Sequence, residues 1–520
     1  MRSSLSTLNL TDLLRLMSKK SLLPYALYRA EQVRALDRNA IDQHGIPGFE
    51  LMQRAGNAAF ARLRARWPEA RRLAVLAGAG NNGGDGYVIA RLALEQGWPV
   101  RLLTLGDHDR LRAEAADSAR AFAQAGGRVE RFQALPPDAD LIVDAMLGTG
   151  LERPVAGDWA SAITAANGSR APVLAVDIPS GLHADTGRVL GVAVEAELTV
   201  SFIGLKQGLF TGRGPDHCGE ISFDALQVPP AVYAGQILSA RRLDWHKERE
   251  LLPRRRRAAH KGDCGHVLII GGSPGMSGAA RLAGEAALRA GAGLVTVATH
   301  PEHAALLNLT RPELMVQAVA DVSALERAAE RADLIAIGPG LAQGAWSQAL
   351  FEQALALDKP LVLDADALSL LAASPRQHGN WVLTPHPGEA ARLLGLTVAE
   401  VEQDRFAAVE ALQRRYGGVV VLKGAGTLIR GPGYRPTGLC SDGNPGMASA
   451  GMGDTLTGII AALMAQGRAA GFGLEQAAVA GVCLHAAAGD LAARHGQRGL
   501  LASDLITALR ATLALAEEGV

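Results

Sequence analysis

The chain has 520 residues, 48% of them hydrophobic and 20% charged, a balance typical of a globular protein with about two to four domains. Basic and acidic side chains number 52 each, so the zero net charge argues against a nucleic acid or an acidic membrane as a partner bound through bulk charge. Four widely spaced cysteines form no CxxC pair, which argues against a zinc ribbon or a disulfide framework and favours the reducing cytoplasm.

Residues 1–23 carry scattered leucines interrupted by polar and basic side chains. They lack the apolar core of a signal peptide, and no run in the chain approaches the roughly 18 apolar residues of a membrane span. We therefore interpret residues 1–23 as an N-terminal extension and expect no membrane partner.

A first series of strands alternating with helices occupies residues 24–228. An apolar run at residues 73–77 is followed by a glycine-rich turn at 78–86, helical spacing at 88–95 and a second strand at 100–105. This alternation predicts a doubly wound, Rossmann-like α/β domain with a parallel sheet. Its further strands are predicted at residues 141–143, 173–176 and 198–203.

A second α/β series follows a break in the pattern. Pro229 and Pro230 open a stretch without periodicity, so we place a linker at residues 229–240 and a second domain at 241–520. The arginine run at 254–257 fits either a phosphate site or a solvated charged face. Strands are predicted at residues 266–270, 294–298, 334–337, 361–363, 382–383 and 419–422, and the chain is almost wholly helical from 453 to 518.

The glycine-rich turn of the first domain contains Gly78, Gly80 and Gly83 in a GxGxxG pattern between a strand and a helix. Backbone N–H groups in such a turn, together with the helix N-terminus, bind pyrophosphate, although a tight turn without a ligand uses the same glycines. Asp85 continues the loop, and an acid this close to phosphates argues against an ordinary dehydrogenase.

Acidic residues follow two predicted strands of the first domain, Asp144 before a glycine turn and Asp177 before Pro179. Because the carboxyl ends of parallel strands meet at one edge of a sheet, these acids and Ser180 are expected to converge on Asn82 from the glycine loop. The all-oxygen set suits a hard cation, whereas each acid alone serves equally well as a helix cap.

Together, the segments 80–86 (GNNGGDG), 143–150 (VDAMLGTG) and 177–181 (DIPSG) closely resemble the NAD(P)H-hydrate epimerase family, over about residues 24–228. The resemblance implies a potassium site formed by Asn82, Asp144 and Ser180, and it aligns Lys206 with the family's later lysine. The substrate contacts that it implies are Asn81, Asn82, Gly83, Gly84, Asp85, Gly148, Thr149, Gly150, Leu151, Glu152, Arg153, Pro154 and Asp177.

In the second domain, Gly451, Gly453 and Asp454 open a predicted helix. Gly453 lets the backbone approach an anion, and the helix N-terminus offers free N–H donors. An acid at this point is electrostatically costly unless it acts as the base for a substrate hydroxyl, although a helix N-cap is the alternative. The pattern resembles the ribokinase superfamily, in which this Asp activates the hydroxyl that attacks phosphorus.

Further segments are similar to the ADP-dependent NAD(P)H-hydrate dehydratase family of that superfamily, over about residues 240–520. They are 260–262 (HKG), the glycine turn at 271–279, 338–340 (GPG), 363–367 (LDADA), 384–389 (TPHPGE), 422–427 (LKGAGT) and 451–454 (GMGD). The resemblance implies hydrated-nicotinamide contacts at Ala279, Gly340, His386 and Asp454, and nucleotide contacts at Lys423, Gly424, Ala425, Gly426, Thr427 and Gly453. Ser369 departs from the pattern, because many relatives carry Asn there.

Both resemblances concern one damaged cofactor, in which water has added across the 5,6 double bond of the nicotinamide of NADH or NADPH. They imply that the first domain interconverts the R and S forms of NADHX and NADPHX, and that the second dehydrates the S form with ADP, giving AMP and phosphate. Potassium is implied for the first domain and magnesium for the second, and we expect a homo-oligomer.

Chemical reasoning assigns Asp177 as the acid/base of epimerisation with Lys206 as its electrostatic partner, and Asp454 as the base of dehydration. In the alternative, Asp177 only hydrogen-bonds the substrate and Lys206 is a surface lysine. Two other functions stay open: a ribokinase-type small-alcohol kinase fused to a non-catalytic nucleotide-binding module, or a first domain that binds a ligand without turnover.

Overall fold

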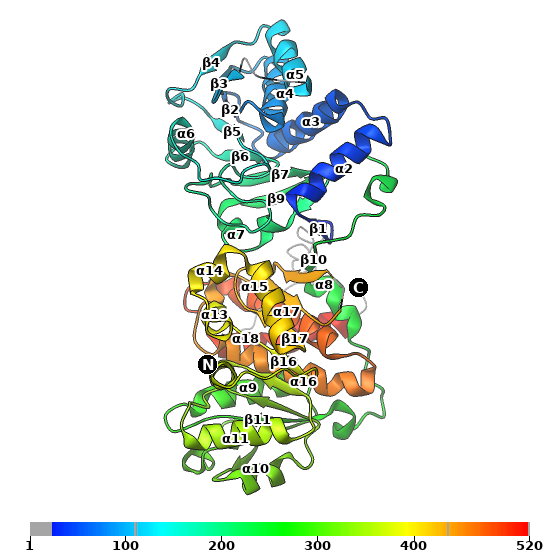
Figure 1. Cartoon of the computed structure of the whole chain (residues 1–520), viewed down its shortest axis with the longest axis vertical. Coiled ribbons are helices and arrows are strands. Elements are labelled where there is room, and N and C mark those ends of the chain that lie inside the picture. The colour runs from blue at the N-terminus through cyan, green and yellow to red at the C-terminus, as the bar shows by residue number, and fades with distance from the viewer. Residues whose placement is uncertain (1–22, 109–110, 112, 434–435, 518–520) are drawn as a thin grey trace, which may run out of the picture. The chain divides into compact units, whose positions relative to one another are not determined.

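The computed structural model describes residues 23–108, 111, 113–433 and 436–517, so nearly all of the predicted N-terminal extension lies outside the described residues. The chain divides between Arg241 and Arg242 into two compact units, which we call unit 1 and unit 2 (Figure 1). The segment 229–240, predicted as a linker, contains the short turn Pro230–Tyr233, whose Val232 is buried in the core of unit 1.

Unit 1 contains a seven-stranded sheet in the order β4-β3-β2-β5-β6-β7-β9, in which every neighbouring pair is parallel. A small group, β10-β1-β8, lies apart from this sheet. The strands are β1 (Ala26–Tyr28), β2 (Leu73–Ala77), β3 (Val100–Thr104), β4 (Val129–Arg131), β5 (Leu141–Ala145), β6 (Val173–Val176), β7 (Leu198–Phe202), β8 (Leu205–Lys206), β9 (Glu220–Asp224) and β10 (Ala240–Leu243). The helices are α2 (Ala30–Asp42), α3 (Gly48–Arg66), α4 (Asn81–Glu95), α5 (Ala113–Gln124), α6 (Asp158–Asn167) and α7 (Gly214–His217).

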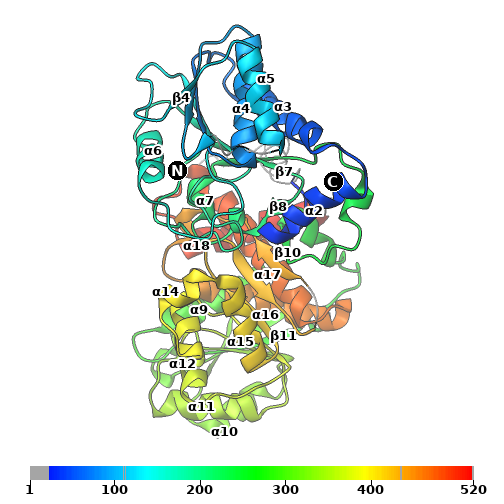
Figure 2. The same cartoon turned by 45° about the horizontal axis from the view of Figure 1, so that its top comes forward.

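Alternate residues of the central strands bury opposite faces of this sheet. In β2, Leu73 and Val75 belong to a core that includes α2, α3 and α4, whereas Ala74 and Leu76 pack with the core around α6. Figure 2 shows α3, α4 and α5 side by side on one face, and the contacts between these helices agree. Helices on both faces explain why the inner strands are apolar throughout and confirm the predicted doubly wound arrangement.

Unit 2 contains a mixed sheet in the order β13-β12-β11-β14-β15-β16-β17-β18-β19, parallel from β13 to β17 and antiparallel beyond. Its strands are β11 (His266–Ile270), β12 (Leu294–Thr299), β13 (Met315–Ala318), β14 (Leu334–Ile337), β15 (Leu361–Leu363), β16 (Trp381–Leu383), β17 (Val419–Leu422), β18 (Thr427–Arg430) and β19 (Thr437–Cys440). Its helices are α8 (Trp245–Glu248), α9 (Ser277–Arg289), α10 (Val322–Ala329), α11 (Ala345–Ala356), α12 (Ala365–Ala373), α13 (Pro387–Leu394), α14 (Val398–Gln403), α15 (Arg405–Tyr416), α16 (Met452–Ala470), α17 (Leu474–Ala492) and α18 (Ala502–Glu517).

The C-terminal helices form the helical block that the sequence predicts. α16 packs against α9 and α17, and α17 packs against α18. The stretch Leu474–His495 is long and apolar enough to cross a membrane by length and composition alone, but 61% of its most apolar 18-residue window is buried inside the protein. Such burial is what a core helix shows, so the stretch is weak evidence for a membrane span.

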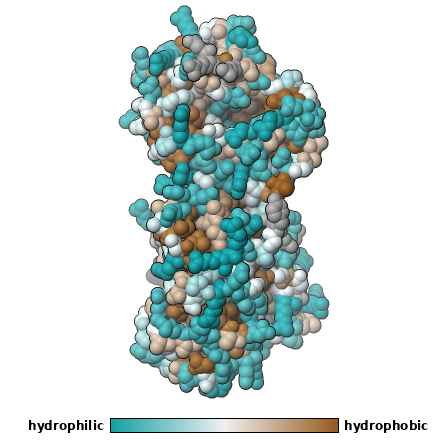
Figure 3. Space-filling view, in the orientation of Figure 1, coloured by the Kyte–Doolittle hydropathy of each residue, from teal (hydrophilic) through white to brown (hydrophobic). Residues whose placement is uncertain are grey.

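Short edge strands were missed by sequence reasoning because they lack apolar periodicity. All three residues of β4, at one edge of the sheet in unit 1, are exposed. β13, at one edge of the sheet in unit 2, is mostly exposed as well. The arginine run at 254–257 is exposed, as expected of a solvated face. On the face shown in Figure 3, hydrophobic residues are interspersed among hydrophilic ones in both units.

Candidate active sites

The glycine-rich segment of unit 1 is a shorter turn than predicted, because α4 already begins at Asn81, with Gly80 as its N-cap. Glycines are required here because backbone segments approach closely. A Cβ at Gly78 would lie 1.9 Å from the carbonyl oxygen of Met146, and a Cβ at Gly83 would lie 1.8 Å from that of Gly78. The first turn of α4, with its free N–H groups, is thereby held against the carboxyl end of β5.

Asp144 and Ser180 form a buried hydrogen-bonded pair at that end of the sheet. The N–H of Ser180 donates to Asp144 Oδ2 at 2.7 Å, and its Oγ donates to Asp144 Oδ1 at 2.6 Å. The N–H of Leu147 donates to Ser180 Oγ at 2.8 Å, which ties the following turn to the pair. Burial raises the pKa of Asp144 to about 6, although the hydrogen bonds from Ser180 oppose the shift. Asp144 lies within β5, so it is not a helix cap.

Asn82 adjoins the same turn, since a Cβ at Gly148 would lie 3.4 Å from the Cβ of Asn82. Both the oxygen and the nitrogen of the Asn82 amide are buried, and neither has a hydrogen-bond partner among the described residues. Leaving a buried polar group unsatisfied costs about 1–3 kcal/mol. The orphaned amide oxygen therefore points to a ligand at this position.

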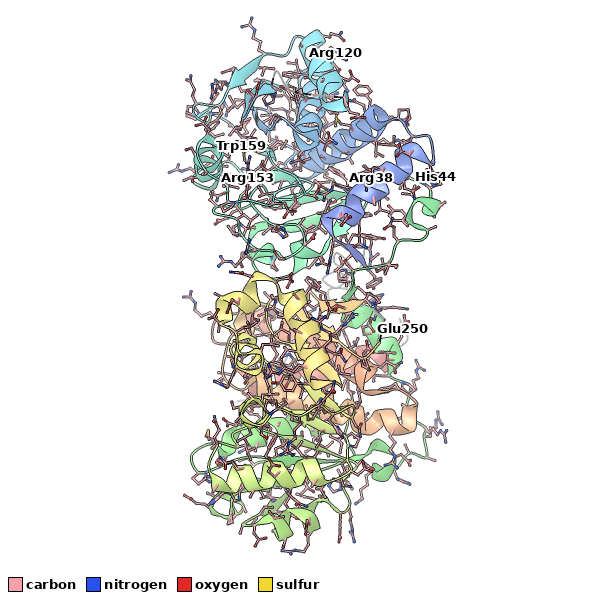
Figure 4. All side chains as sticks on the ribbon, viewed as in Figure 1. Arg38, His44, Arg120, Arg153, Trp159 and Glu250 are labelled. Atoms are coloured by element: carbon pink, nitrogen blue, oxygen red, sulfur yellow. The ribbon has the colours of Figure 1, made fainter. Side chains whose placement is uncertain are left out.

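A cavity of about 810 Å³ opens beside these groups. Figure 4 labels Arg153 and Trp159, which line the cavity, and Arg38 on α2, whose neighbour Asp37 also lines it. The cavity wall includes these predicted substrate residues: Asn81, Asn82, Asp85, Gly148, Thr149, Gly150, Leu151, Glu152, Arg153 and Asp177. Gly83, Gly84 and Pro154 are outside the lining, and the two glycines are buried within α4.

Asp177 and Lys206 meet at the wall of the cavity. Asp177 adopts a φ of +68°, rare for a residue other than glycine, and its N–H donates to the Val200 carbonyl oxygen at 2.8 Å. Lys206 donates from Nζ to Asp177 Oδ1 and, at 3.0 Å, to Ser201 Oγ. The lysine is fully buried, so it is not a surface residue, and the ion pair fixes the carboxylate that faces the cavity.

Residues that the motifs did not indicate also form this wall. Helices α2 and α3 contribute Arg34, Asp37 and Met52, and α5 contributes Glu114. Burial is the main cause that raises the pKa of Asp37 to about 6, and burial also raises the pKa of Asp85 well above its usual range. A sequence signal for Asp37 existed, because it interrupts the apolar stripe of α2.

In unit 2, the carboxyl ends of four neighbouring parallel strands bring the predicted motifs to one edge. The N–H of Asp364, after β15, donates to the Ile337 carbonyl oxygen at 3.1 Å, and the N–H of Thr384, after β16, donates to that of Leu363 at 3.1 Å. The N–H of Lys423, after β17, donates to the Pro385 carbonyl oxygen at 2.9 Å. This edge is where open α/β sheets bind ligands.

Lys423 lies in a charged network at this edge. Its Nζ donates to Asp364 Oδ1 at 2.7 Å and lies 3.7 Å from Glu389 Oε2, and Thr457 on α16 donates to Asp364 Oδ2 at 2.7 Å. Although burial opposes both shifts, the charge of Lys423 lowers the pKa of Asp364 and the carboxylates raise that of Lys423. A Cβ at Gly453 would lie 3.3 Å from Lys423 Nζ, so the ammonium group reaches the start of α16.

Asp454 occupies the third position of α16, whose N-cap is Gly451 in the left-handed conformation, so Asp454 is not the N-cap. Its carboxylate has no hydrogen-bond partner among the described residues. Burial, followed by repulsion from Asp364, raises its pKa to about 6. An unpaired carboxylate with a raised pKa at a helix start is suited to accept a proton.

The three other predicted nicotinamide contacts fall into two places. The N–H of Ser273 donates to the Gly340 carbonyl oxygen at 2.7 Å, and a Cβ at Gly340 would lie 3.2 Å from that of Ala279, so these two belong to one turn. His386 is the N-cap of α13, with Nδ1 accepting the N–H of Gly388 at 2.9 Å. Its ring therefore positions the helix while 55% of the side chain stays exposed.

The predicted nucleotide loop is supported from behind by Arg405, which is almost fully buried. Its guanidinium donates to the Lys423 carbonyl oxygen at 3.2 Å and forms an ion pair with Glu402 at 2.8 Å. Gly424 adopts a φ of +140°, and a Cβ there would lie 2.8 Å from the Arg405 guanidinium. Sequence reasoning gave no role to Arg405 or Thr457, and it included Asp364 only as part of the segment 363–367, without a role of its own.

Comparisons with known proteins cover both units. One family model, described as the YjeF-related protein N-terminus, matches residues 48–208, and another, described as NAD(P)H-hydrate dehydratase, matches residues 267–511. The chain is 48% identical to the bifunctional NAD(P)H-hydrate repair enzyme Nnr of Coxiella burnetii, over 93% of this chain and 98% of that protein. It is 46% identical to the enzyme of that name from Escherichia coli, over 94% of each. A crystal structure of a ribokinase-like superfamily protein from Enterococcus faecalis is 31% identical, with a TM-score of 0.50 over 54% of this chain and 98% of that one.

Proposed function

Because the chain belongs to the bifunctional NAD(P)H-hydrate repair enzymes, it epimerises and dehydrates hydrated NADH and NADPH, and we propose here which residues carry each step. The substrate holds a hydroxyl on C6 of the nicotinamide ring, next to the ring nitrogen. Unit 1 inverts that carbon, and unit 2 removes the hydroxyl from the S form to restore the 5,6 double bond.

The Asp177–Lys206 ion pair at the wall of the cavity is the observation that carries the epimerase assignment. Inverting C6 without a redox cofactor requires the C6–O bond to break and re-form. The ring nitrogen supplies the electrons that release the oxygen, provided that carboxyl chemistry donates a proton to the leaving hydroxyl and accepts one from the attacking water. Asp177 serves as that acid/base, and the buried ammonium of Lys206 holds it in place.

The first turn of α4 and the turn at residues 148–153 bind the rest of the substrate. Free N–H groups at the helix start suit the pyrophosphate, as the resemblance implies for Asn81 and Asn82. Arg153 also lines the cavity and supplies a positive charge on that side. These contacts would hold the nicotinamide ring against Asp177 while the phosphates remain fixed.

We propose that a potassium ion occupies the group formed by Asn82, Asp144 and Ser180. The residues fit such an ion, because the buried oxygen of Asn82 lacks a protein partner and Asp144 provides a buried carboxylate. A monovalent cation bound here would screen Asp144 from the substrate phosphates. Since Leu147 donates to Ser180, the ion site and the substrate turn share their backbone.

In unit 2, Asp454 is proposed to take the proton of the C6 hydroxyl while that oxygen attacks the terminal phosphorus of ADP. Lys423 and the N–H groups at the start of α16 stabilise the charge on the transferring phosphoryl group, because Lys423 Nζ reaches Gly453. AMP is released, and the phosphate then leaves C6 with its bonding electrons. The C5–H bonding pair forms the 5,6 double bond, and the C5 proton passes to the departing phosphate or to water. Phosphorylation converts a poor leaving group into a good one.

Magnesium fits this edge as an ion that enters with the nucleotide. Among the described residues, no three His, Cys, Asp or Glu side chains form a metal-binding group. Mg²⁺ is usually bound by substrate phosphates with one or two carboxylates, and Glu389 is a carboxylate at this edge that could take part. When bound, the ion would neutralise charge on the phosphates. All four cysteines are free, in keeping with the proposed cytoplasmic location, and the homo-oligomer stays a prediction.

The test is to incubate the full chain with a mixture of R-NADPHX and S-NADPHX and with ADP, and to follow NADPH absorbance and nucleotide products. We expect both epimers to be converted and AMP to accumulate in step with NADPH. Asp177→Asn should leave the R form behind, and Asp454→Asn should block NADPH formation from either form. ADP formed from ATP with a simple alcohol, without recovery of NADPH, would instead identify an alcohol kinase.

A further inference from the structure

Epimerisation places a demand on the cavity that Asp177 alone does not meet. When the hydroxyl leaves, the planar ring carbon must be approached by water from the opposite face. With the phosphates and the ring held in place, one carboxyl group faces only one side of the ring. A second proton-transferring group is therefore needed on the other side, and it should line the same cavity without being bound by the protein.

Asp37 meets these conditions. It lines the cavity from α2, whereas Asp177 lines it from the end of β6. Its carboxylate has no hydrogen bond or ion pair with any described residue. Within α2, Asp37 lies one turn after Val33, beside Leu36, on the stripe of the helix that is buried against the core. An acid on such a stripe is costly unless it has a chemical task.

The charged and titratable groups around Asp37 come from each neighbouring element. Asp177 and Lys206 face it from the sheet, Arg38 follows it on α2, Asp85 interacts with it from α4, and the Tyr233 hydroxyl lies near it. Burial and Asp177 raise the pKa of Asp37 to about 6, against the effect of Lys206 and Arg38. Asp177 pairs with Lys206, whereas Asp37 has no such partner among the described residues, so the two carboxyl groups have different surroundings.

We propose that Asp37 is the second catalytic carboxyl group of the epimerase, acting on the face of the nicotinamide ring opposite Asp177. This inference rests on the proposed function of unit 1. In one direction, Asp37 donates its proton to the C6 oxygen, the C6–O bond breaks with its electrons remaining on the departing water, and the ring nitrogen lone pair forms the C6–N double bond. Water then attacks C6 from the other face, its oxygen forms the new C6–O bond, and its proton passes to Asp177. The reverse direction exchanges the two roles.

Asp85 is less suited to this role, although it belongs to the same group of acids. Burial, with further contributions from Asp177 and Asp37, raises its pKa well above the usual range. This direction favours the protonated form of Asp85, which is a hydrogen-bond donor to the substrate. Asp37 titrates close to the working range, which allows it to change protonation state during turnover.

The experiment measures epimerisation of pure R-NADPHX and pure S-NADPHX by the full chain without ADP, corrected for the spontaneous reaction. Asp37→Asn is expected to lower kcat about a hundredfold or more in both directions, with little change in KM. Asp42→Asn, an exposed acid at the end of the same helix, is the matched control and should keep wild-type rates. A kcat of Asp37→Asn within about threefold of wild type, or a loss confined to KM, would overturn the proposal.

The pH profile separates proton transfer from a structural role. Asp37 must hold its proton to release the C6 oxygen, so kcat/KM of the wild type should fall tenfold per pH unit above about pH 6, for both epimers alike. Asp37→Glu should show the same fall of kcat/KM at high pH, at a reduced overall rate. A kcat/KM of Asp37→Glu that does not change with pH would count against the proposal even if Asp37→Asn failed to fold. If the wild type itself does not interconvert the epimers, the proposed function fails instead, whatever the variants do.

Discussion

Asp454→Asn should remove dehydration while making unit 2 more stable, a combination that a structural residue would not show. The substitution preserves size and removes the base. General base catalysis typically contributes about 10²- to 10⁴-fold, so kcat/KM for S-NADPHX should fall by about two orders of magnitude or more. At about 1.36 kcal/mol for each factor of ten, the barrier would rise by about 3–5 kcal/mol.

The expected gain in stability follows from the raised pKa. Burial and repulsion by Asp364 raise the pKa of Asp454 from its ordinary 3.8 to about 6. The folded state therefore disfavours the ionised form, and this group costs stability increasingly as the pH rises from about 4 to about 6. The full shift corresponds to about 3 kcal/mol. Because the residue is partly exposed, we expect Asp454→Asn to stabilise by about 1–3 kcal/mol at pH 8 and by little at pH 4.

The assay pairs two measurements on the same full-length preparations. NADPH absorbance after addition of S-NADPHX and ADP reports dehydration, and calorimetric unfolding at pH 8 reports stability, with a rise of about 2–4 °C expected for each kcal/mol. In the wild type, kcat/KM should also decline tenfold per pH unit below about pH 6, as the base becomes protonated. Near-normal NADPH formation by the variant would refute the reasoning, as would a lower unfolding temperature at pH 8.

Three other substitutions test the remaining assignments. Asn82→Ala removes an amide that has no hydrogen-bond partner among the described residues. We expect potassium chloride to raise the unfolding temperature of the wild type above its value in sodium chloride, and we expect no such rise for Asn82→Ala. An equal rise in both proteins would contradict the ion site. Asp177→Asn should lower consumption of pure R-NADPHX by about a hundredfold when ADP is present and the variant's own unit 2 removes any S form. A rate close to wild type would exclude Asp177 as the acid/base. Lys423→Met should lower kcat/KM for ADP by about a hundredfold and destabilise the protein by about 3–5 kcal/mol, because it leaves Asp364 without its ion-pair partner. The double variant that also carries Asp364→Asn should regain the unfolding temperature but not the activity. Recovery of activity in the double variant would show that Lys423 acts only through the ion pair.

The parts of the fold that sequence reasoning predicted are those governed by local pattern. The inner strands are apolar runs between turns, and the alternation with helices is visible from residue 73 onward. The GxGxxG segment correctly predicted that a helix follows the glycine turn, but the helix begins earlier than predicted, at Asn81. Asn81 and Asn82 favour turns by themselves, and they are helical here, where Gly78 and Gly83 pack closely together. Tertiary contact, rather than propensity, decided where that helix begins.

The candidate sites show the same division between local and long-range information. Asp144, Asp177 and Asp454 stand out because each lies in a short motif at a strand or helix end. Asp37 comes from a helix more than a hundred residues before Asp177, and no local pattern says that the two share a cavity. Likewise, the burial of Lys206 excludes the alternative of a surface lysine, which the sequence left open because exposure at a strand end depends on what the rest of the chain places over it.

The hydrogen bond from Leu147 to Ser180 has a consequence for the cell as a whole. The bond links the backbone of the turn proposed to bind the substrate to Ser180, which belongs to the proposed ion site of unit 1. A cell that loses potassium, for example during osmotic shock, should therefore slow epimerisation before dehydration. The S form of the damaged cofactor would continue to be dehydrated while the R form accumulates. The ratio of R to S epimer in a cell extract should therefore rise after the cell has lost potassium.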